Sequence, residues 1–178
     1  EAALCMAANG IKAYVFDALR PTPELSFAVR YFKATAGIVI TASHNPPEYN
    51  GYKVYWEDGA QVTSPRDIEI INCVKEVTDY YTVKTMDKQA AVEAGLYISV
   101  GSEVDDAFIA ELKKQIIHPE VIAEVADDIS IVYTPFNGTG NVPARRILKE
   151  IGFKNVYVVP EQELPDPKFT TLEYPNPE

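Results

Sequence analysis

The chain has 178 residues, 47% of them hydrophobic, which is enough apolar material for one large or two small cores. Its 26 acidic and 16 basic residues give a net charge of −10 with no basic cluster, which argues against nucleic acid or an anionic membrane as a partner. No apolar stretch approaches the ~20 residues of a membrane span and no signal peptide is visible. Cys5 and Cys73 form no metal or disulfide spacing, so we expect a reducing, cytoplasmic compartment.

Helical and extended patterns alternate through the first hundred residues. The predicted segments are a helix over 1–9, a strand over 11–16, a helix from 22, strands over 37–41 and 52–56, a helix from 64, a short helix over 87–94 and an extended segment over 96–100. Thr22 is the expected N-cap of its helix, with Pro23 in the first turn. In the helix from residue 64, Ile70, Val74 and Val77 fall on one side.

The alternation continues to residue 160. The predicted segments are a helix from 102, a shorter helix from 119, a strand over 129–133, a helix over 142–151 and a strand over 155–159. We therefore expect an α/β fold with mixed, partly parallel sheets flanked by helices. Gly138-Thr139-Gly140 suits a tight strand-to-helix turn or a backbone phosphate cradle, and the turn is the simpler interpretation. Residues after Pro160 are expected to be loosely held or packed on a neighbouring copy.

The most informative segment is the loop over residues 41–53. It follows a short apolar run at 37–40 that reads as a buried strand. Pro46 and Pro47 argue against a helix here, and Asn50-Gly51 permits positive φ, so the chain is expected to turn sharply and return.

This loop presents a hydroxyl, an imidazole and an ammonium group, from Ser43, His44 and Lys53. A serine oxygen is a poor nucleophile until a base or its electrostatic surroundings activate it, and a nearby cation would stabilise phosphate on that oxygen. Taken alone, a Ser-His pair in a proline-rich turn is more often an ordinary solvated turn, because short motifs match frequently by chance.

The full string Thr-Ala-Ser-His-Asn-Pro-Pro-Glu-Tyr-Asn-Gly-Tyr-Lys resembles the phosphoserine loop of the α-D-phosphohexomutase superfamily, the phosphoglucomutases and phosphomannomutases. Its continuation over 54–61 is similar to the phosphoglucomutase/phosphopentomutase branch. Weaker resemblances to the family lie at 20–25, 133–140 and 161–178.

Members of this superfamily have four domains. The resemblance implies that residues 1–101 are the C-terminal part of domain I with the phosphoserine loop. Residues 102–178 would be the N-terminal part of domain II, truncated before the metal loop. We therefore expect this chain to be a fragment that is inactive by itself and that self-associates through exposed truncated faces.

The resemblance also implies a reaction. Ser43 would carry the phosphoryl group and bind Mg²⁺ through its phosphate, with the other metal ligands outside this chain. Lys53 would serve as general acid/base or charge stabiliser, and His44, like Lys53, would contact the substrate. The expected substrate is a small phosphosugar: glucose 1-phosphate and glucose 6-phosphate would be interconverted through a bisphosphate intermediate, with a hexose bisphosphate as activator. The alternatives are a phosphopentomutase, a phosphomannomutase or a non-catalytic phosphosugar-binding module.

Overall fold

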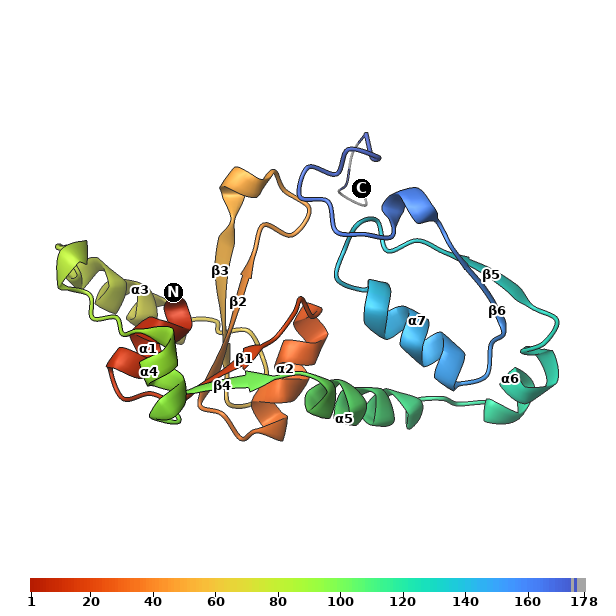
Figure 1. The fold of residues 1–178 in the computed structure, drawn as a ribbon, viewed down its shortest axis with the longest axis horizontal. Helices are drawn as coiled ribbons and strands as arrows, with labels where there is room; N and C mark the ends of the chain where they lie inside the picture. Colours follow the sequence, from red (N-terminus) through yellow and green to blue (C-terminus); the bar gives the residue numbers. More distant parts are fainter. Residues whose placement is uncertain (174, 176–178) are drawn as a thin grey trace. The chain divides into compact units, whose positions relative to one another are not determined.

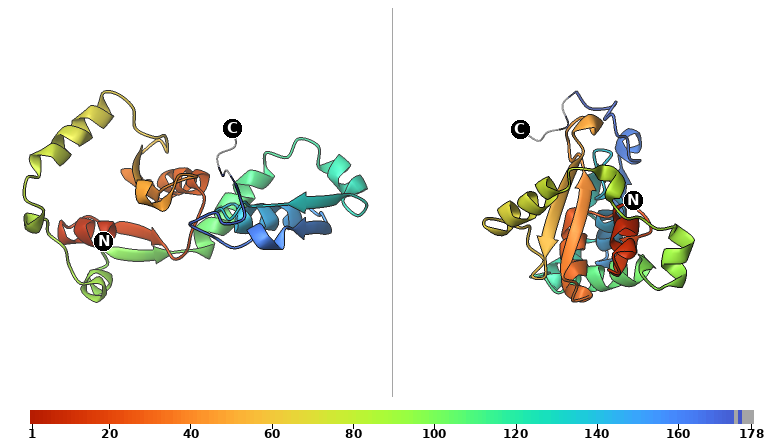
Figure 2. Two further views of the ribbon diagram at one scale, coloured as in Figure 1. Left: turned by 90° about the horizontal axis from the view of Figure 1, so that it is seen from above. Right: turned by 90° about the vertical axis from the view of Figure 1, so that its left-hand side faces the viewer.

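The structure is a computed structural model that describes residues 1–173 and 175. Its described strands form three two-stranded sheets with helices around them (Figure 1; Figure 2). The strand pairs are β1 (Ala13–Phe16) with β4 (Tyr97–Val100), parallel; β2 (Ala36–Thr41) with β3 (Gly51–Trp56), antiparallel; and β5 (Ser130–Tyr133) with β6 (Asn155–Val158), parallel. The helices are α1 (Ala2–Ala8), α2 (Thr22–Tyr31), α3 (Arg66–Glu76), α4 (Lys88–Glu93), α5 (Ser102–Lys113), α6 (Pro119–Val125) and α7 (Asn141–Glu150). The expected α/β class with mixed, partly parallel sheets is confirmed.

One compact unit comprises residues 1–19 and 61–103. It contains α1, α3, α4 and the β1–β4 pair, and its buried apolar residues are small: Ala7, Ala91 and Val100. α1 ends before Gly10, whose φ of 75° is a left-handed conformation that glycine adopts without steric cost. Helix and strand are thus joined as the sequence predicts.

In the same unit, the apolar side of α3 is not covered. None of the residues of α3 is buried. Val74 is 59% exposed and Val77, just past the helix, is 40% exposed. The spacing of apolar residues indicates which side of a helix is apolar, but it does not determine whether another element covers that side.

The other compact unit comprises residues 20–60 and 104–178. In its first part α2 packs against β2, and Ala28 and Val29 of α2 are buried. α2 begins at Thr22 with Pro21 as its N-cap residue, and no side chain caps it, so the prediction that Thr22 is the N-cap is wrong by one position. Pro21 can take this position because its fixed φ of −71° and its ψ of 150° suit the extended geometry of an N-cap residue.

The second part of this unit carries the β5–β6 pair with α5, α6 and α7. Its buried apolar side chains come from α5 and the residue just after α6: Val104, Ile109 and Ala126. The segment before α7 is a tight turn, in which the Gly138 N–H donates to the Pro135 carbonyl at 2.9 Å.

Residues after Pro160 are held by specific hydrogen bonds, contrary to the expectation that they would be loose. Asn137, which is 7% exposed, is the centre of these contacts. Its Nδ2 donates to the Leu164 carbonyl at 2.8 Å, its Oδ1 accepts from Thr171 Oγ1 at 3.1 Å, and its backbone N–H donates to the Gln162 carbonyl at 2.8 Å. Residues 174 and 176–178, which contribute to the family resemblance, lie outside the described residues. Within the described part of the chain, no helix is long and apolar enough to cross a bilayer.

Candidate functional site

The candidate site is the tip of the β2–β3 hairpin. β2 ends at Thr41 and β3 begins at Gly51, and these two residues pair directly in the antiparallel register. The strands are long enough to hold the connecting loop at one end of a regular ladder. The prolines were expected to prevent a helix here, and the loop includes a 3-10 turn of three residues, Pro47–Tyr49. Proline is accepted at the first position of such a turn because its missing N–H would have had no partner there.

Ser43 has the unusual backbone of this loop. Its φ is 56°, which is uncommon for a residue with a Cβ. Asn50, where the sequence suggested positive φ, has a φ of −57° instead, and Gly51 is not among the residues with positive φ. The Ser43 N–H donates to Thr41 Oγ1 at 2.8 Å, and the Asn45 N–H donates to the Ala42 carbonyl at 2.9 Å, closing a tight turn. Backbone of this kind costs free energy and is frequent at functional sites, which makes Ser43 a candidate on structural grounds also.

The Ser43 hydroxyl is exposed and lies beside an imidazole. Its Oγ is 3.3 Å from His44 Nδ1, within hydrogen-bond reach, with the donor set by the imidazole tautomer. His44 is half-buried while Ser43 is exposed, so the hydroxyl remains open to an approaching molecule. The structure therefore brings together the predicted Ser43 and His44.

Lys53 lies further down the hairpin, in β3. It pairs with Val39, two positions from the Thr41–Gly51 pair, so Lys53 and Thr41 point to the same face of the sheet. Diagonal neighbours of this kind are separated by roughly 7–8 Å. Because Thr41 bonds the Ser43 backbone, a half-buried lysine on its face can extend toward the serine. With the residues that the structure describes, Lys53 forms no hydrogen bond or ion pair.

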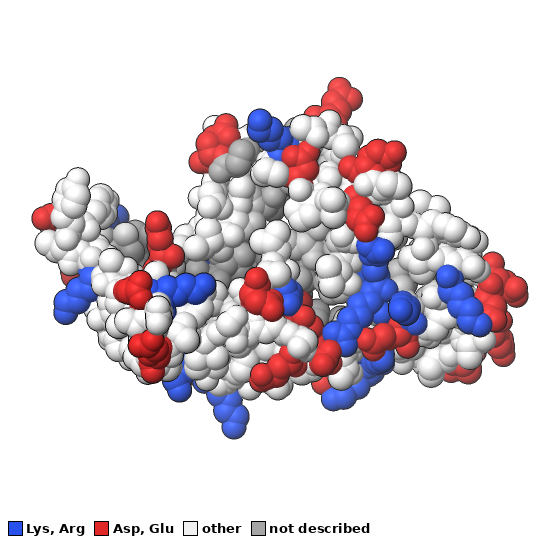
Figure 3. Space-filling model, viewed as in Figure 1, with Lys and Arg blue, Asp and Glu red and all other residues white. Residues whose placement is uncertain are grey.

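An open hollow of about 610 Å³ lies beside the loop, within the same compact unit. His44 and Asn45 line one side of it, and Lys168, Phe169 and Glu173 belong to the other. A volume of this size suits a small organic ligand. On the face of the molecule shown in Figure 3, acidic and basic side chains are interspersed, which agrees with the absence of a basic run in the sequence.

The described residues do not form a complete metal site. Across residues 1–173 and 175, no group of three or more His, Cys, Asp or Glu side chains could hold a metal ion. Mg²⁺ prefers six oxygen ligands in octahedral geometry, and of the predicted site residues only Ser43 has a side-chain oxygen.

Sequence reasoning missed a buried acidic residue near the hairpin. Glu24 of α2 is 1% exposed, although carboxylates are almost never buried without a partner. A signal was present, since Glu24 precedes the buried Ala28 by four residues and therefore lies on the same helix face. Sequence reasoning also missed Thr41 as the residue that bonds the Ser43 backbone.

Comparison with known proteins gives a consistent result. Residues 1–81 match the family profile "Phosphoglucomutase/phosphomannomutase, alpha/beta/alpha domain I", and residues 106–178 match that of "alpha/beta/alpha domain II". The predicted boundary after residue 101 lies between the two matches and stays a prediction.

Individual relatives cover almost the whole chain. The chain is 38% identical over 176 residues to the glucose 1,6-bisphosphate synthase of Homo sapiens, which covers 99% of this chain and 28% of that protein. It is 36% identical to the phosphoglucomutase of Staphylococcus haemolyticus, covering 97% of this chain and 30% of that protein. A solved structure from Thermus thermophilus that carries the name phosphomannomutase superposes with a TM-score of 0.73 at 25% identity, covering 97% of this chain and 35% of that one. The chain thus spans about a third or less of the length of these proteins.

Proposed function

Since this chain belongs to the phosphoglucomutase/phosphomannomutase superfamily, we propose that it is part of a phosphosugar mutase in which Ser43 carries the phosphoryl group. The observation that carries this proposal is the geometry of Ser43: an exposed hydroxyl on a tight turn with φ of 56°, fixed by Thr41 and adjacent to His44. A rigidly held acceptor oxygen favours phosphoryl transfer, which depends on in-line positioning and charge neutralisation.

The reaction consists of two transfers. In the first, the bond between phosphorus and Ser43 Oγ breaks, a bond from phosphorus to a sugar hydroxyl oxygen forms, and the hydroxyl proton passes to a base. The resulting bisphosphate turns around in the site. In the second transfer its other phosphate returns to Ser43, and a proton is given back to the sugar oxygen that is released. No phosphate is gained or lost, so the sum is an isomerisation.

We propose Lys53 and His44 as the groups that handle these protons and contact the substrate. His44 is supported by its 3.3 Å contact with Ser43 Oγ. Lys53 is supported by its position on the same sheet face as Thr41. A lysine Nζ can also act as a fixed cation beside the phosphate, and kinetics of variants separate these roles.

The proposed Mg²⁺ would be held in part by phosphate on Ser43, with its remaining ligands outside the described residues. When bound, such an ion neutralises charge on the transferring phosphoryl group. A hexose bisphosphate activator would restore the phosphate whenever Ser43 becomes dephosphorylated. Because the described residues do not complete the metal site, we expect no turnover from the 178-residue chain alone.

The proposed substrate pair is glucose 1-phosphate and glucose 6-phosphate, a small-molecule partner that fits the hollow beside His44. Pentose and mannose phosphates are the alternatives, together with phosphosugar binding without catalysis. We propose the cytoplasm as the compartment, because Cys5 and Cys73 are free thiols and thiols stay reduced there. Nucleic acid and membranes are not proposed as partners, and self-association of the isolated chain stays a prediction.

The decisive experiment labels the serine. The full-length protein is incubated with glucose 1,6-bisphosphate carrying ³²P, digested, and mapped by mass spectrometry for phosphate on Ser43. Turnover is then measured with glucose, pentose and mannose phosphates. The Ser43→Ala variant is expected to lose label and to lower turnover by on the order of 10³-fold or more. The matched control, Ser99→Ala, alters an exposed serine of β4 and should retain both.

Labelled Ser43 without turnover on any sugar would leave a phosphoprotein that is not a mutase. Binding of phosphosugar without label would support the non-catalytic alternative. Either result would overturn the proposed function.

A further inference from the structure

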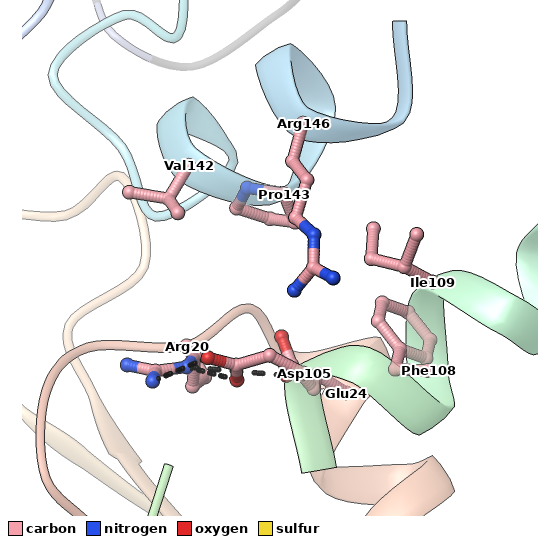
Figure 4. A pocket seen from close by; sticks show the side chains of 8 residues that line it. All are labelled: Arg20, Glu24, Asp105, Phe108, Ile109, Val142, Pro143 and Arg146. Carbon is pink, nitrogen blue, oxygen red and sulfur yellow. Dashed lines mark hydrogen bonds and ion pairs between the residues drawn. The ribbon is translucent and has the colours of Figure 1, made fainter. Parts of the chain in front are cut away.

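The buried Glu24 belongs to a charged cluster that the proposed reaction does not use. Figure 4 shows Glu24 of α2 and Arg20, which lies just before that helix, facing Asp105 of α5, with Arg146 of α7 pointing toward them. All four line one small cavity of about 30 Å³ within a single compact unit. The cluster therefore joins three helices that are far apart in sequence.

Arg20 holds Asp105 with two hydrogen bonds. Its Nε donates to Asp105 Oδ1 at 2.6 Å and its Nη2 donates to Oδ2 at 2.8 Å. The same guanidinium Nε is 3.9 Å from Glu24 Oε1, too far for a hydrogen bond. Asp105 is thus the carboxylate whose charge Arg20 neutralises directly.

The Glu24 and Asp105 carboxyl groups lie beside the same guanidinium Nε of Arg20 and line the same small cavity. Two ionised carboxylates this close repel each other and have no donor between them, so a proton on one of the pair is favoured. Asp105 already accepts two N–H groups, whereas Glu24 is 1% exposed and its Oε1 accepts no hydrogen bond among the described residues. The proton therefore belongs to Glu24.

We propose that this proton, carried by Glu24 and shared with Asp105, holds α2 against α5, and that its loss as pH rises weakens this contact. The inference goes beyond the proposed function and does not depend on it. When Glu24 is ionised, two negative charges face each other in a space that admits about one water molecule, so the carboxylate cannot regain its hydration.

Charged groups from several elements face Glu24. Arg20, just before α2, and Arg146 on α7 favour an ionised Glu24, and Asp105 on α5 opposes it. Arg146 is largely occupied by Asp106 at 2.6 Å and Glu150 at 2.7 Å. Burial is the largest effect, and with the Asp105 hydrogen bond and charge it raises the pKa of Glu24 from 4.5 to about 7.

The sign of the pH effect follows from this direction. A carboxyl with a raised pKa in the folded state stabilises the fold fully below pH 4.5, and this contribution is lost as pH rises toward 7. Asp105 does not change its protonation state between pH 4.5 and 7. Although burial opposes the shift, hydrogen bonds from Arg20 and Glu24 lower its pKa below 3.8, so its contribution is lost only in stronger acid.

The test combines a direct titration with a variant. In the unaltered protein, the ¹³C carboxyl resonance of Glu24 should titrate near pH 7, and the backbone amides of Asp105 and Asp106 should shift with the same midpoint. In Glu24→Gln the amide donates permanently to Asp105, so the step between pH 4.5 and 7 should vanish. Relative to this variant, the unaltered protein's unfolding constant should increase by up to roughly 10²-fold across the window.

The matched control is Glu103→Gln, the same substitution at an exposed position of α5, which should retain the pH dependence of the unaltered protein. A Glu24 resonance that titrates near pH 4.5 would overturn the proposal. An equal pH dependence in Glu24→Gln and the unaltered protein would overturn it as well. Because the resonance is measured without any substitution, the test remains valid if the variant fails to fold.

Discussion

Replacing Gly37 tests how closely α2 must approach the strand that leads to Ser43. A Cβ on residue 37 would lie 2.5 Å from Val29 Cγ2 and 3.4 Å from Leu25 Cδ2. Real Cβ atoms essentially never show the first distance, and Val29 is 3% exposed, so it has no solvent to turn into. The Gly37→Ala variant must therefore move α2 away from β2.

The expected cost follows from two opposing effects. Overpacking a core typically lowers the free energy of unfolding by about 1–3 kcal/mol. Replacing glycine lowers the entropy of the unfolded chain, which raises the free energy of unfolding by roughly 0.4–1 kcal/mol. We expect Gly37→Ala to lower the free energy of unfolding by about 1–2 kcal/mol. Val29→Ala alone should cost about 2 kcal/mol, since two buried methyl groups are lost.

The double variant is the sharper measurement. In Gly37→Ala/Val29→Ala the new methyl group enters the space that Val29 vacates, so the combined loss should be about 1 kcal/mol less than the sum of the two. Urea unfolding can be followed through Trp56, the single tryptophan, which lies in β3 of the same hairpin. Strict additivity, or an unchanged stability of Gly37→Ala, would refute the close approach of α2 and β2.

Three other substitutions test separate parts of the structure. In the full-length protein, Lys53→Met should lower the kcat of the proposed mutase reaction by roughly 10²–10⁴-fold, the scale of a lost proton-transfer group, whereas an increase in KM alone would assign Lys53 to binding. Asn137→Ala should lower the free energy of unfolding by about 1–3 kcal/mol because the Leu164 carbonyl loses its donor. Asn137→Gly removes the strain of φ 59° and should recover only part of that loss, so full recovery would contradict the role of the side chain. Arg20→Lys retains the charge but not the two-point bond to Asp105, and urea titration should show a loss of about 1–2 kcal/mol; unchanged stability would mean that this bond adds nothing.

Local patterns in the sequence were sufficient for the order of elements and for the position of the candidate site. Apolar periodicity and glycine placement predicted the alternation of helices and strands, because these signals depend on neighbouring residues. The string over 41–53 pointed to Ser43, His44 and Lys53 through its resemblance to the superfamily's phosphoserine loop, and the strand that precedes it was predicted to within one residue. The strands and helices depend on local conformational preferences, so no partner element was needed to infer them.

Tertiary structure decided which of these residues are buried, strained or paired. The positive φ belongs to Ser43 and not to the Asn-Gly pair, because the strand register closes the loop at Thr41 and Gly51. Glu24 is buried beside a cavity that it shares with Asp105, 81 positions later in the chain. Contacts between residues so distant in sequence leave no periodic signal. The charge state of Glu24 and the strain at Ser43 therefore arise only when the elements pack together.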